Sequence, residues 1–134
     1  MSSPAILEPL ARALAARTDV KLALLFGSHA RGASHEGSDV DVAVIAPNVD
    51  RFELGAALTR ALGCQVDVVP LDDPSVPLLE ALIEDGIVVH EGAPGAGALW
   101  RSRTLAQLET DRPWYARMRD AWLDRVAREG LPRW

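Results

Sequence analysis

The chain has 134 residues, of which 49% are hydrophobic and 25% charged, with a net charge of −5 and one cysteine. This length suits one globular domain with its own core. A single cysteine excludes an internal disulfide and favours a reducing compartment, and no apolar stretch is long enough to cross a bilayer. We therefore expect a cytoplasmic protein without a membrane contact.

The charge is divided unevenly along the chain. Residues 1–99 carry six Lys or Arg against fourteen Asp or Glu, a balance of −8, and residues 100–134 carry a balance of +3. Non-specific nucleic-acid binding needs a basic face that releases counterions from phosphates, so the acidic body argues against direct nucleic-acid binding. The arginine-rich tail favours an acidic partner, although a solvated amphipathic helix explains any single arginine in it as well.

Helices and strands are predicted to alternate from the first residues onward. Apolar residues at helical spacing predict a helix over residues 4–17. A near-continuous apolar run over residues 20–26 predicts a strand buried on both faces. Residues 27–37, rich in Gly, Ser and Ala, predict a loop with one helical turn, and residues 39–46 predict a second strand.

The alternation continues to residue 92. Residues 50–62 predict a helix, residues 64–69 a third strand, residues 75–85 a short helix and residues 87–90 a fourth strand. This order predicts an α/β fold in which helices flank a small mixed sheet.

The composition changes after the fourth predicted strand. Residues 92–97 are the clearest linker in the chain, and two helices are predicted beyond it, over residues 98–109 and 113–129. We therefore expect a core over residues 1–92 and, over residues 93–134, a linker and C-terminal helical appendage that packs on the core or on a partner.

A glycine–serine pair ends the first predicted strand. Gly27 has no Cβ and lets the backbone approach a ligand closely, and Ser28 can donate its hydroxyl and its N–H to a phosphate oxygen. Taken alone, the pair is better explained as a plain turn at the end of a strand. Its surroundings match neither a Walker loop nor a dinucleotide-binding fingerprint.

Two aspartates follow after a gap of ten residues. Asp39 and Asp41 alternate with valines, so both carboxylates lie on one face of the second predicted strand. Two neighbouring like charges repel each other, and Mg²⁺ removes that cost because it prefers hard carboxylate oxygens. Aspartate is disfavoured in strands, which argues against a merely solvated edge. The pair predicts a divalent metal site.

A third carboxylate interrupts the third predicted strand. Asp67 stands among valines, where a carboxylate is costly unless it is paired or binds a metal. If this strand lies beside the second, Asp67 meets Asp39 and Asp41. Three carboxylates could then hold two metal ions that flank the attacking and leaving oxygens of a phosphoryl displacement.

Together these residues resemble a known superfamily. Gly27-Ser28, the gap of ten residues, Asp39-Val40-Asp41 and Asp67 resemble the nucleotidyltransferases related to DNA polymerase β. The Ala30-Arg31-Gly32 continuation, the short length and the C-terminal helices resemble the minimal nucleotidyltransferase group, many of which are antitoxins encoded beside a HEPN-domain toxin. The resemblance implies the DNA polymerase β-like nucleotidyltransferase fold.

The resemblance also implies a site and a reaction. Its nucleotide-binding residues would be Gly27, Ser28 and Arg31, and its catalytic and metal-binding residues Asp39, Asp41 and Asp67, with two Mg²⁺ ions. An acceptor hydroxyl would attack the α-phosphorus of ATP, and AMP would be transferred. In the antitoxin group the acceptor is a tyrosine of the HEPN toxin, whose RNase activity is thereby silenced, so a hetero-oligomer with such a toxin is expected.

Some alternatives stay open at this stage. A small-molecule nucleotidyltransferase that acts on an aminoglycoside-like alcohol would use the same site, and an antitoxin that acts by contact alone would not need it. Arg31 could pair with Glu36 or another acid instead of a phosphate, and His29 and His35 could either touch the nucleotide or be ordinary exposed loop residues. Tyr115, Met118, Trp122 and Val126 share one helical face, which predicts packing on the body or on a partner.

Overall fold

The computed structural model describes residues 3–34 and 37–131 and contains one four-stranded sheet. Its strands are β1 (Leu22–Phe26), β2 (Val40–Ile45), β3 (Val66–Pro70) and β4 (Ile87–Glu91), in the spatial order β3-β2-β1-β4. β1 runs antiparallel to β2 and β4, and β2 runs parallel to β3. The predicted small mixed sheet is therefore confirmed, with strand ends within two residues of those expected.

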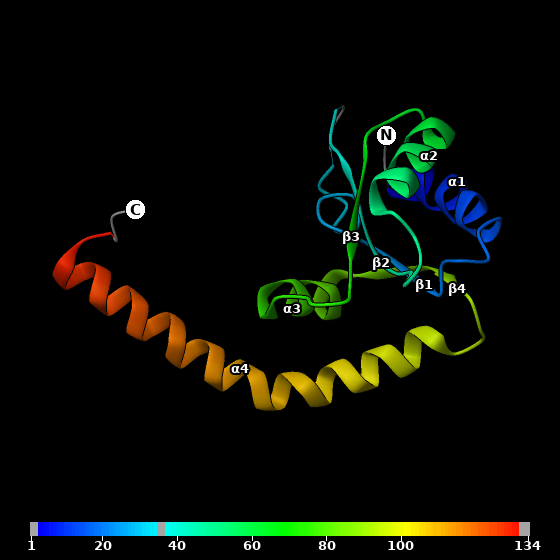
Figure 1. The fold of residues 1–134 in the computed structure, drawn as a ribbon. Helices are drawn as coiled ribbons and strands as arrows, with labels where there is room; N and C mark the ends of the chain where they lie inside the picture. Colours follow the sequence, from blue (N-terminus) through cyan, green and yellow to red (C-terminus); the bar gives the residue numbers. More distant parts are fainter. Residues whose placement is uncertain (1–2, 35–36, 132–134) are drawn as a thin grey trace.

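Helices cover both faces of this sheet (Figure 1). α1 (Ser3–Ala15) and α2 (Arg51–Leu62) pack on one face, against side chains such as Leu25 and Val42. α3 (Val76–Asp85) and the beginning of α4 (Ala96–Glu129) cover the other face, where Leu24 and Ala43 are buried. Alternate residues of each strand point to opposite faces, so the near-continuous apolar strands predicted by the sequence serve both cores.

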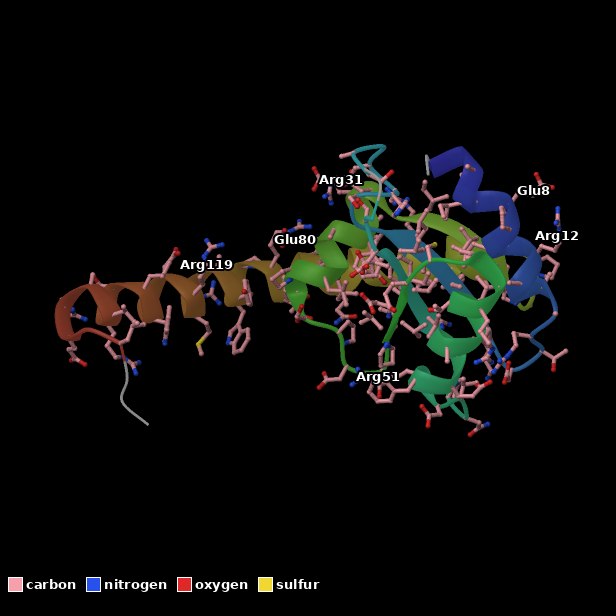
Figure 2. All side chains as sticks on the ribbon, turned by 90° about the horizontal axis from the view of Figure 1, so that it is seen from above. Glu8, Arg12, Arg31, Arg51, Glu80 and Arg119 are labelled. Atoms are coloured by element: carbon pink, nitrogen blue, oxygen red, sulfur yellow. The ribbon has the colours of Figure 1, made fainter. Side chains whose placement is uncertain are left out.

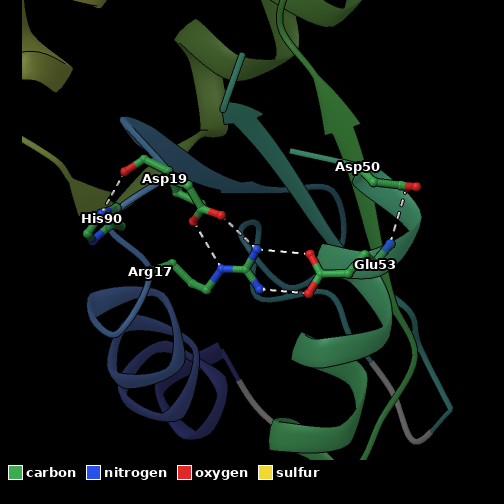
Figure 3. Close-up of polar contacts among 6 residues, drawn as sticks. Arg17, Asp19, Asp50, Glu53 and His90 are labelled. Atoms are coloured by element: carbon green, nitrogen blue, oxygen red, sulfur yellow. Dashed lines mark hydrogen bonds and ion pairs between the residues drawn. The ribbon is translucent and has the colours of Figure 1, made fainter. Parts of the chain in front are cut away.

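An ion-paired arginine joins α1 to α2 (Figure 3). Arg17 follows α1, and its guanidinium donates to both carboxylate oxygens of Asp19, at 3.0 Å each, and to those of Glu53, at 3.1 and 2.9 Å. These hydrogen bonds hold the pKa of Asp19 and of Glu53 below the usual range. Because Glu53 lies in the first turn of α2, this contact fixes how the two helices meet.

The outer edge of β3 has no neighbouring strand, and little of it can pair with one. The N–H of Val66 donates to the hydroxyl of Thr59 on α2, at 3.0 Å, instead of pointing to solvent. Pro70, which ends the strand, has no N–H. The side of β3 that faces away from β2 is therefore short of free donors.

One continuous helix replaces the two that the sequence predicts at the C-terminus. α4 spans Ala96–Glu129 and includes Pro113 in its interior. Proline removes the hydrogen bond to the carbonyl of Glu109. Both residues are exposed, so water can satisfy that carbonyl, and the helix continues with the bow visible in Figure 1.

Only the first part of α4 packs on the body. Leu108 is fully buried, the Arg101 guanidinium donates to the Ile83 carbonyl at 2.9 Å, and Arg112 pairs with Glu80 of α3 at 3.2 Å. No described residue beyond Arg112 is buried. The second part of the helix extends away from the sheet (Figures 1 and 2). No helix of the described residues is long and apolar enough to span a bilayer.

The helical face expected to pack on the body does not do so. Met118 is 54% exposed and Trp122 is 44% exposed, and Trp114 on the same side is 56% exposed. The prediction that this helical face packs on the body is therefore wrong for these side chains. The other explanation, contact with a partner, stays open.

The predicted linker is a tight turn. The Gly92 N–H donates to the Lys21 carbonyl at 2.8 Å, and Gly97 already lies in α4, where its N–H donates to a carboxylate oxygen of Glu91 at 2.6 Å. A Cβ on Gly97 would stand 2.9 Å from a methyl carbon of Val88. The helix thus approaches β4 at a point where only glycine fits.

Substitution of Gly97 tests this close approach. We expect Gly97→Leu to lower the free energy of unfolding by about 1–3 kcal/mol, because the side chain must push α4 off β4. Ala98→Leu, at the next and exposed position, should change it by less than about 0.5 kcal/mol. Urea unfolding of both variants measures the difference, and equal stabilities would contradict the packing described.

Candidate active site

The sheet brings two of the predicted carboxylates side by side. Asp41 of β2 pairs in register with Asp67 of β3 and, on its other side, with Phe26 at the end of β1. Residues in register on parallel strands point to the same face, so both carboxylates lie on the face that α3 covers further along the strands. The predicted neighbourhood of the second and third strands is confirmed.

Asp41 is the most enclosed of the three aspartates. It is half-buried, whereas Asp39, just before β2, and Asp67 are exposed. Burial raises the pKa of Asp41, and the nearby charges of Asp67 and Asp39 raise it further, while His29 and Arg31 act in the opposite direction. A carboxylate that is harder to ionise because of two like charges indicates a site short of positive charge.

The three aspartates are ligands of the type that a hard divalent cation prefers, although their side chains do not converge on one point. No group of three or more His, Cys, Asp or Glu side chains within residues 3–34 and 37–131 is arranged to hold a metal. The Gln65 side-chain amide donates to one carboxylate oxygen of Asp67 at 3.2 Å. Carboxylate oxygens on one sheet edge, with mutual repulsion to relieve, are still the ligands that Mg²⁺ prefers.

Gly27 lies directly against Asp41. A Cβ built on Gly27 would stand 2.6 Å from the nearer carboxylate oxygen of Asp41, which leaves no room for a side chain. Its φ of +78° also favours glycine over every other residue. The glycine–serine turn and the carboxylates, which are separate in the sequence, therefore form one small region.

The segment after β1 is a turn to which no helix is assigned, and only its first hydrogen bond has the spacing of an α-helical turn. The Arg31 N–H donates to the Gly27 carbonyl at 3.2 Å, and the Ala33 N–H donates to the Ser28 carbonyl at 2.9 Å. The first amides of such a turn have no carbonyl partner within it and can serve an anion. Ser28 thus lies at the start of the turn, beside the carboxylates.

Arg31 is exposed on this turn (Figure 2). It forms no ion pair with any residue in the part of the chain that the structure describes, although its charge lowers the pKa of Asp41. The alternative partner, Glu36, lies outside the described residues, as does His35.

His29 does not behave as the exposed loop residue that the sequence suggests. Its side chain is only 2% exposed, and its Nε2 lies 3.2 Å from the carbonyl oxygen of Ser38, the residue before Asp39. No local pattern in the sequence indicates this burial, because the partner, Ser38, lies nine residues further along the chain.

An open groove reaches Asp67 from the edge of the sheet. It has a volume of about 610 Å³ and runs between α2 and β3, with Phe52 and Thr59 of α2 among its lining residues. Asp67 is exposed and is one of the residues that line this groove.

The family of the chain follows from its sequence and agrees with this geometry. The sequence model of the family described as Polymerase beta, Nucleotidyltransferase matches residues 8–94, which include the turn and all three aspartates. The chain belongs to this nucleotidyltransferase family.

Known proteins similar to this nucleotidyltransferase include a curated relative. The protein adenylyltransferase MntA of Shewanella oneidensis is 38% identical over 71 residues, which are 50% of this chain and 51% of the relative. The match thus spans about half the length of the curated relative.

Solved structures resemble the nucleotidyltransferase over more of its length. A crystal structure of a toxin–antitoxin with AMP-PNP contains a chain with 25% identity and a TM-score of 0.73, covering 87% of this chain and 98% of that one. A minimal nucleotidyltransferase has 28% identity and a TM-score of 0.55, covering 65% of this chain and 95% of that one. Together they support the minimal nucleotidyltransferase fold expected from the sequence.

The raised pKa of Asp41 predicts how the thermal stability of the nucleotidyltransferase depends on pH. Because the pKa of Asp41 is raised on folding, its ionisation destabilises the fold above the unfolded pKa of about 4. Without divalent cations, Asp41→Asn should raise the Tm at pH 7 by about 1–3 °C. The gain should disappear as the pH falls below about 4, where the carboxyl is protonated in both states.

Asp39→Asn is the matched control for this measurement. It removes one charge at an exposed position of the same site, so the change in Tm should be smaller than for Asp41→Asn. Thermal unfolding of both variants between pH 3 and pH 8 in EDTA makes the comparison. A lower Tm for Asp41→Asn at pH 7 would contradict the repulsion described.

Proposed function

We propose that this protein is a Mg²⁺-dependent adenylyltransferase that transfers AMP from ATP to a tyrosine of a cognate HEPN-domain toxin and so acts as its antitoxin. The observation that carries the proposal is the contact of the Gly27 backbone with Asp41, which itself lies in register with Asp67. This arrangement sets a phosphate-binding turn against carboxylates. The similarity to MntA and to an antitoxin crystallised with AMP-PNP supports the choice of reaction and substrate.

In this proposal the triphosphate of ATP is bound by the turn after β1. The backbone and hydroxyl of Ser28 donate to phosphate oxygens, Gly27 allows their close approach, and the exposed Arg31 offsets part of their charge. Two Mg²⁺ ions held by Asp39, Asp41 and Asp67 would neutralise the carboxylates and polarise the phosphates.

The reaction is an in-line displacement at the α-phosphorus. The tyrosine oxygen forms a bond to the α-phosphorus while the bond to the oxygen bridging the α- and β-phosphates breaks, and pyrophosphate leaves. The hydroxyl proton goes to Asp67, which is exposed to the groove beside α2. The acceptor protein would therefore approach from the β3 edge of the sheet.

We further propose that residues 1–92 form the catalytic core and residues 93–134 the appendage that contacts the toxin. The family match, over residues 8–94, supports the boundary. Beyond Arg112, α4 exposes a stripe of large apolar side chains, Trp114, Met118 and Trp122, spaced four residues apart. We name this the distal stripe. Tryptophan and arginine are enriched where proteins meet, and the toxin is its proposed occupant.

The transfer of AMP can be measured directly on the partner. Intact-mass spectrometry of the toxin, after incubation with this protein, ATP and Mg²⁺, should show a gain of one or more AMP masses. The double variant Asp39→Ala, Asp41→Ala should abolish the gain. The double variant Asp72→Ala, Asp73→Ala is the matched control, because it removes the same charge at exposed positions beyond the other end of β3 and should leave transfer unchanged.

The outcomes separate the proposed reaction from its alternatives. A stable complex without any gain in mass would overturn the enzymatic antitoxin and leave inhibition by contact alone. Neither binding nor transfer would direct the search to small hydroxylated acceptors.

The distal stripe makes a second prediction about the partner. Met118→Glu places a charge at its centre and should weaken toxin binding at least about 10-fold, since a buried unpaired charge is costly. Ala127→Glu adds the same charge on the opposite side of the helix and should weaken it less than about 3-fold. Titration calorimetry measures both, with circular dichroism as a check on helicity. Equal affinities would place the interface elsewhere.

A further inference from the structure

The turn that carries Ser28 contains a buried polar side chain with no role in the reaction described above. Within the described residues only His29 and Thr104 are polar and buried, and His29 is 2% exposed. Its Nε2 lies 3.2 Å from the carbonyl oxygen of Ser38. A carbonyl only accepts hydrogen bonds, so Nε2 carries the proton in this contact.

The other ring nitrogen has no partner. Nδ1 of His29 is buried and forms no hydrogen bond with any described residue. A buried polar atom without a partner costs stability, and an apolar side chain of similar size would fill the same space without that cost. Filling the interior of the turn therefore does not explain a histidine here. Its Nε2 hydrogen bond is what an apolar side chain could not supply.

That hydrogen bond joins the two halves of the site. His29 directly follows Ser28, and Ser38 directly precedes Asp39, so one contact ties the start of the turn to the entry of β2. On the other side of Ser28, Gly27 approaches Asp41 so closely that a Cβ on it would stand 2.6 Å from a carboxylate oxygen. Both features flank Ser28, whose amide and hydroxyl are the groups proposed to bind phosphate.

We propose that His29 is a positioning residue, which clamps the turn after β1 to the entry of β2 and so sets the spacing between the phosphate-binding groups and the metal-binding carboxylates. It acts through Ser38 and does not touch the nucleotide. The inference rests on the proposed function, since it takes the turn as the site of the triphosphate. Without the clamp, the turn must be ordered when ATP binds, and that ordering weakens binding.

Two substitutions separate the hydrogen bond from the volume of the ring. His29→Gln places an amide nitrogen near the position of Nε2, where it can still donate to the Ser38 carbonyl. His29→Leu fills the space and donates nothing. Using the full chain, titration calorimetry with Mg²⁺ and an ATP analogue that cannot transfer AMP measures affinity. Hydrogen exchange of the amides of residues 28–33, without nucleotide, measures the order of the turn.

We expect His29→Leu to unfold at the same or a higher temperature than the wild type, to bind the analogue about 10-fold more weakly and to exchange these amides faster. His29→Gln should stay within about 3-fold of the wild type in affinity. Wild-type affinity and exchange in His29→Leu would overturn the proposal. Equal losses in both variants would also overturn it, because the ring itself would then be required.

The failure of the proposed function would look different. If the wild type does not bind the analogue at all, nucleotide transfer by this site is wrong. The hydrogen-exchange comparison then decides alone whether His29 orders the turn.

Discussion

The placement of Asp41, half-buried and in register with Asp67, is the constraint on which the site depends. Parallel pairing of β2 and β3 places the two carboxylates in register, and the Gly27 backbone presses against one of them. Burial and like charge together raise the pKa of Asp41. The fold holds this unfavourable pair because the two cores on either face of the sheet, and the Arg17 contact between α1 and α2, stabilise the strands that carry it.

Stability and activity are therefore opposed at one place. Under the proposed function the site binds divalent cations, and an excess of negative charge before they bind is what such a site requires. The buried Nδ1 of His29 has no hydrogen-bond partner, which further lowers the stability of the fold at this site. The remainder of the described chain leaves no other buried side-chain nitrogen or oxygen without a partner, so the local costs coincide with the proposed nucleotide site.

Local sequence patterns predicted the strands and most helices. They did not predict features that depend on contacts between residues far apart in the sequence. Alternation around Asp41 and the apolar runs predicted the strands, because those signals act within a few residues. The burial of His29 depends on Ser38, nine residues away, and no periodicity reports it. The unbroken α4 was missed because proline ends most helices, and here the freed carbonyl reaches water.

The outer edge of β3 limits how this molecule can assemble. An exposed strand edge is a template for other chains, and proteins that pair through it grow into extended sheets. Here Thr59 occupies the Val66 donor and Pro70 has none to offer. A partner that enters the groove beside Asp67 meets few free backbone donors there, so side chains would carry most of its recognition. Strand pairing along this edge, with an acceptor or with a second copy of the chain, therefore has few backbone donors to use.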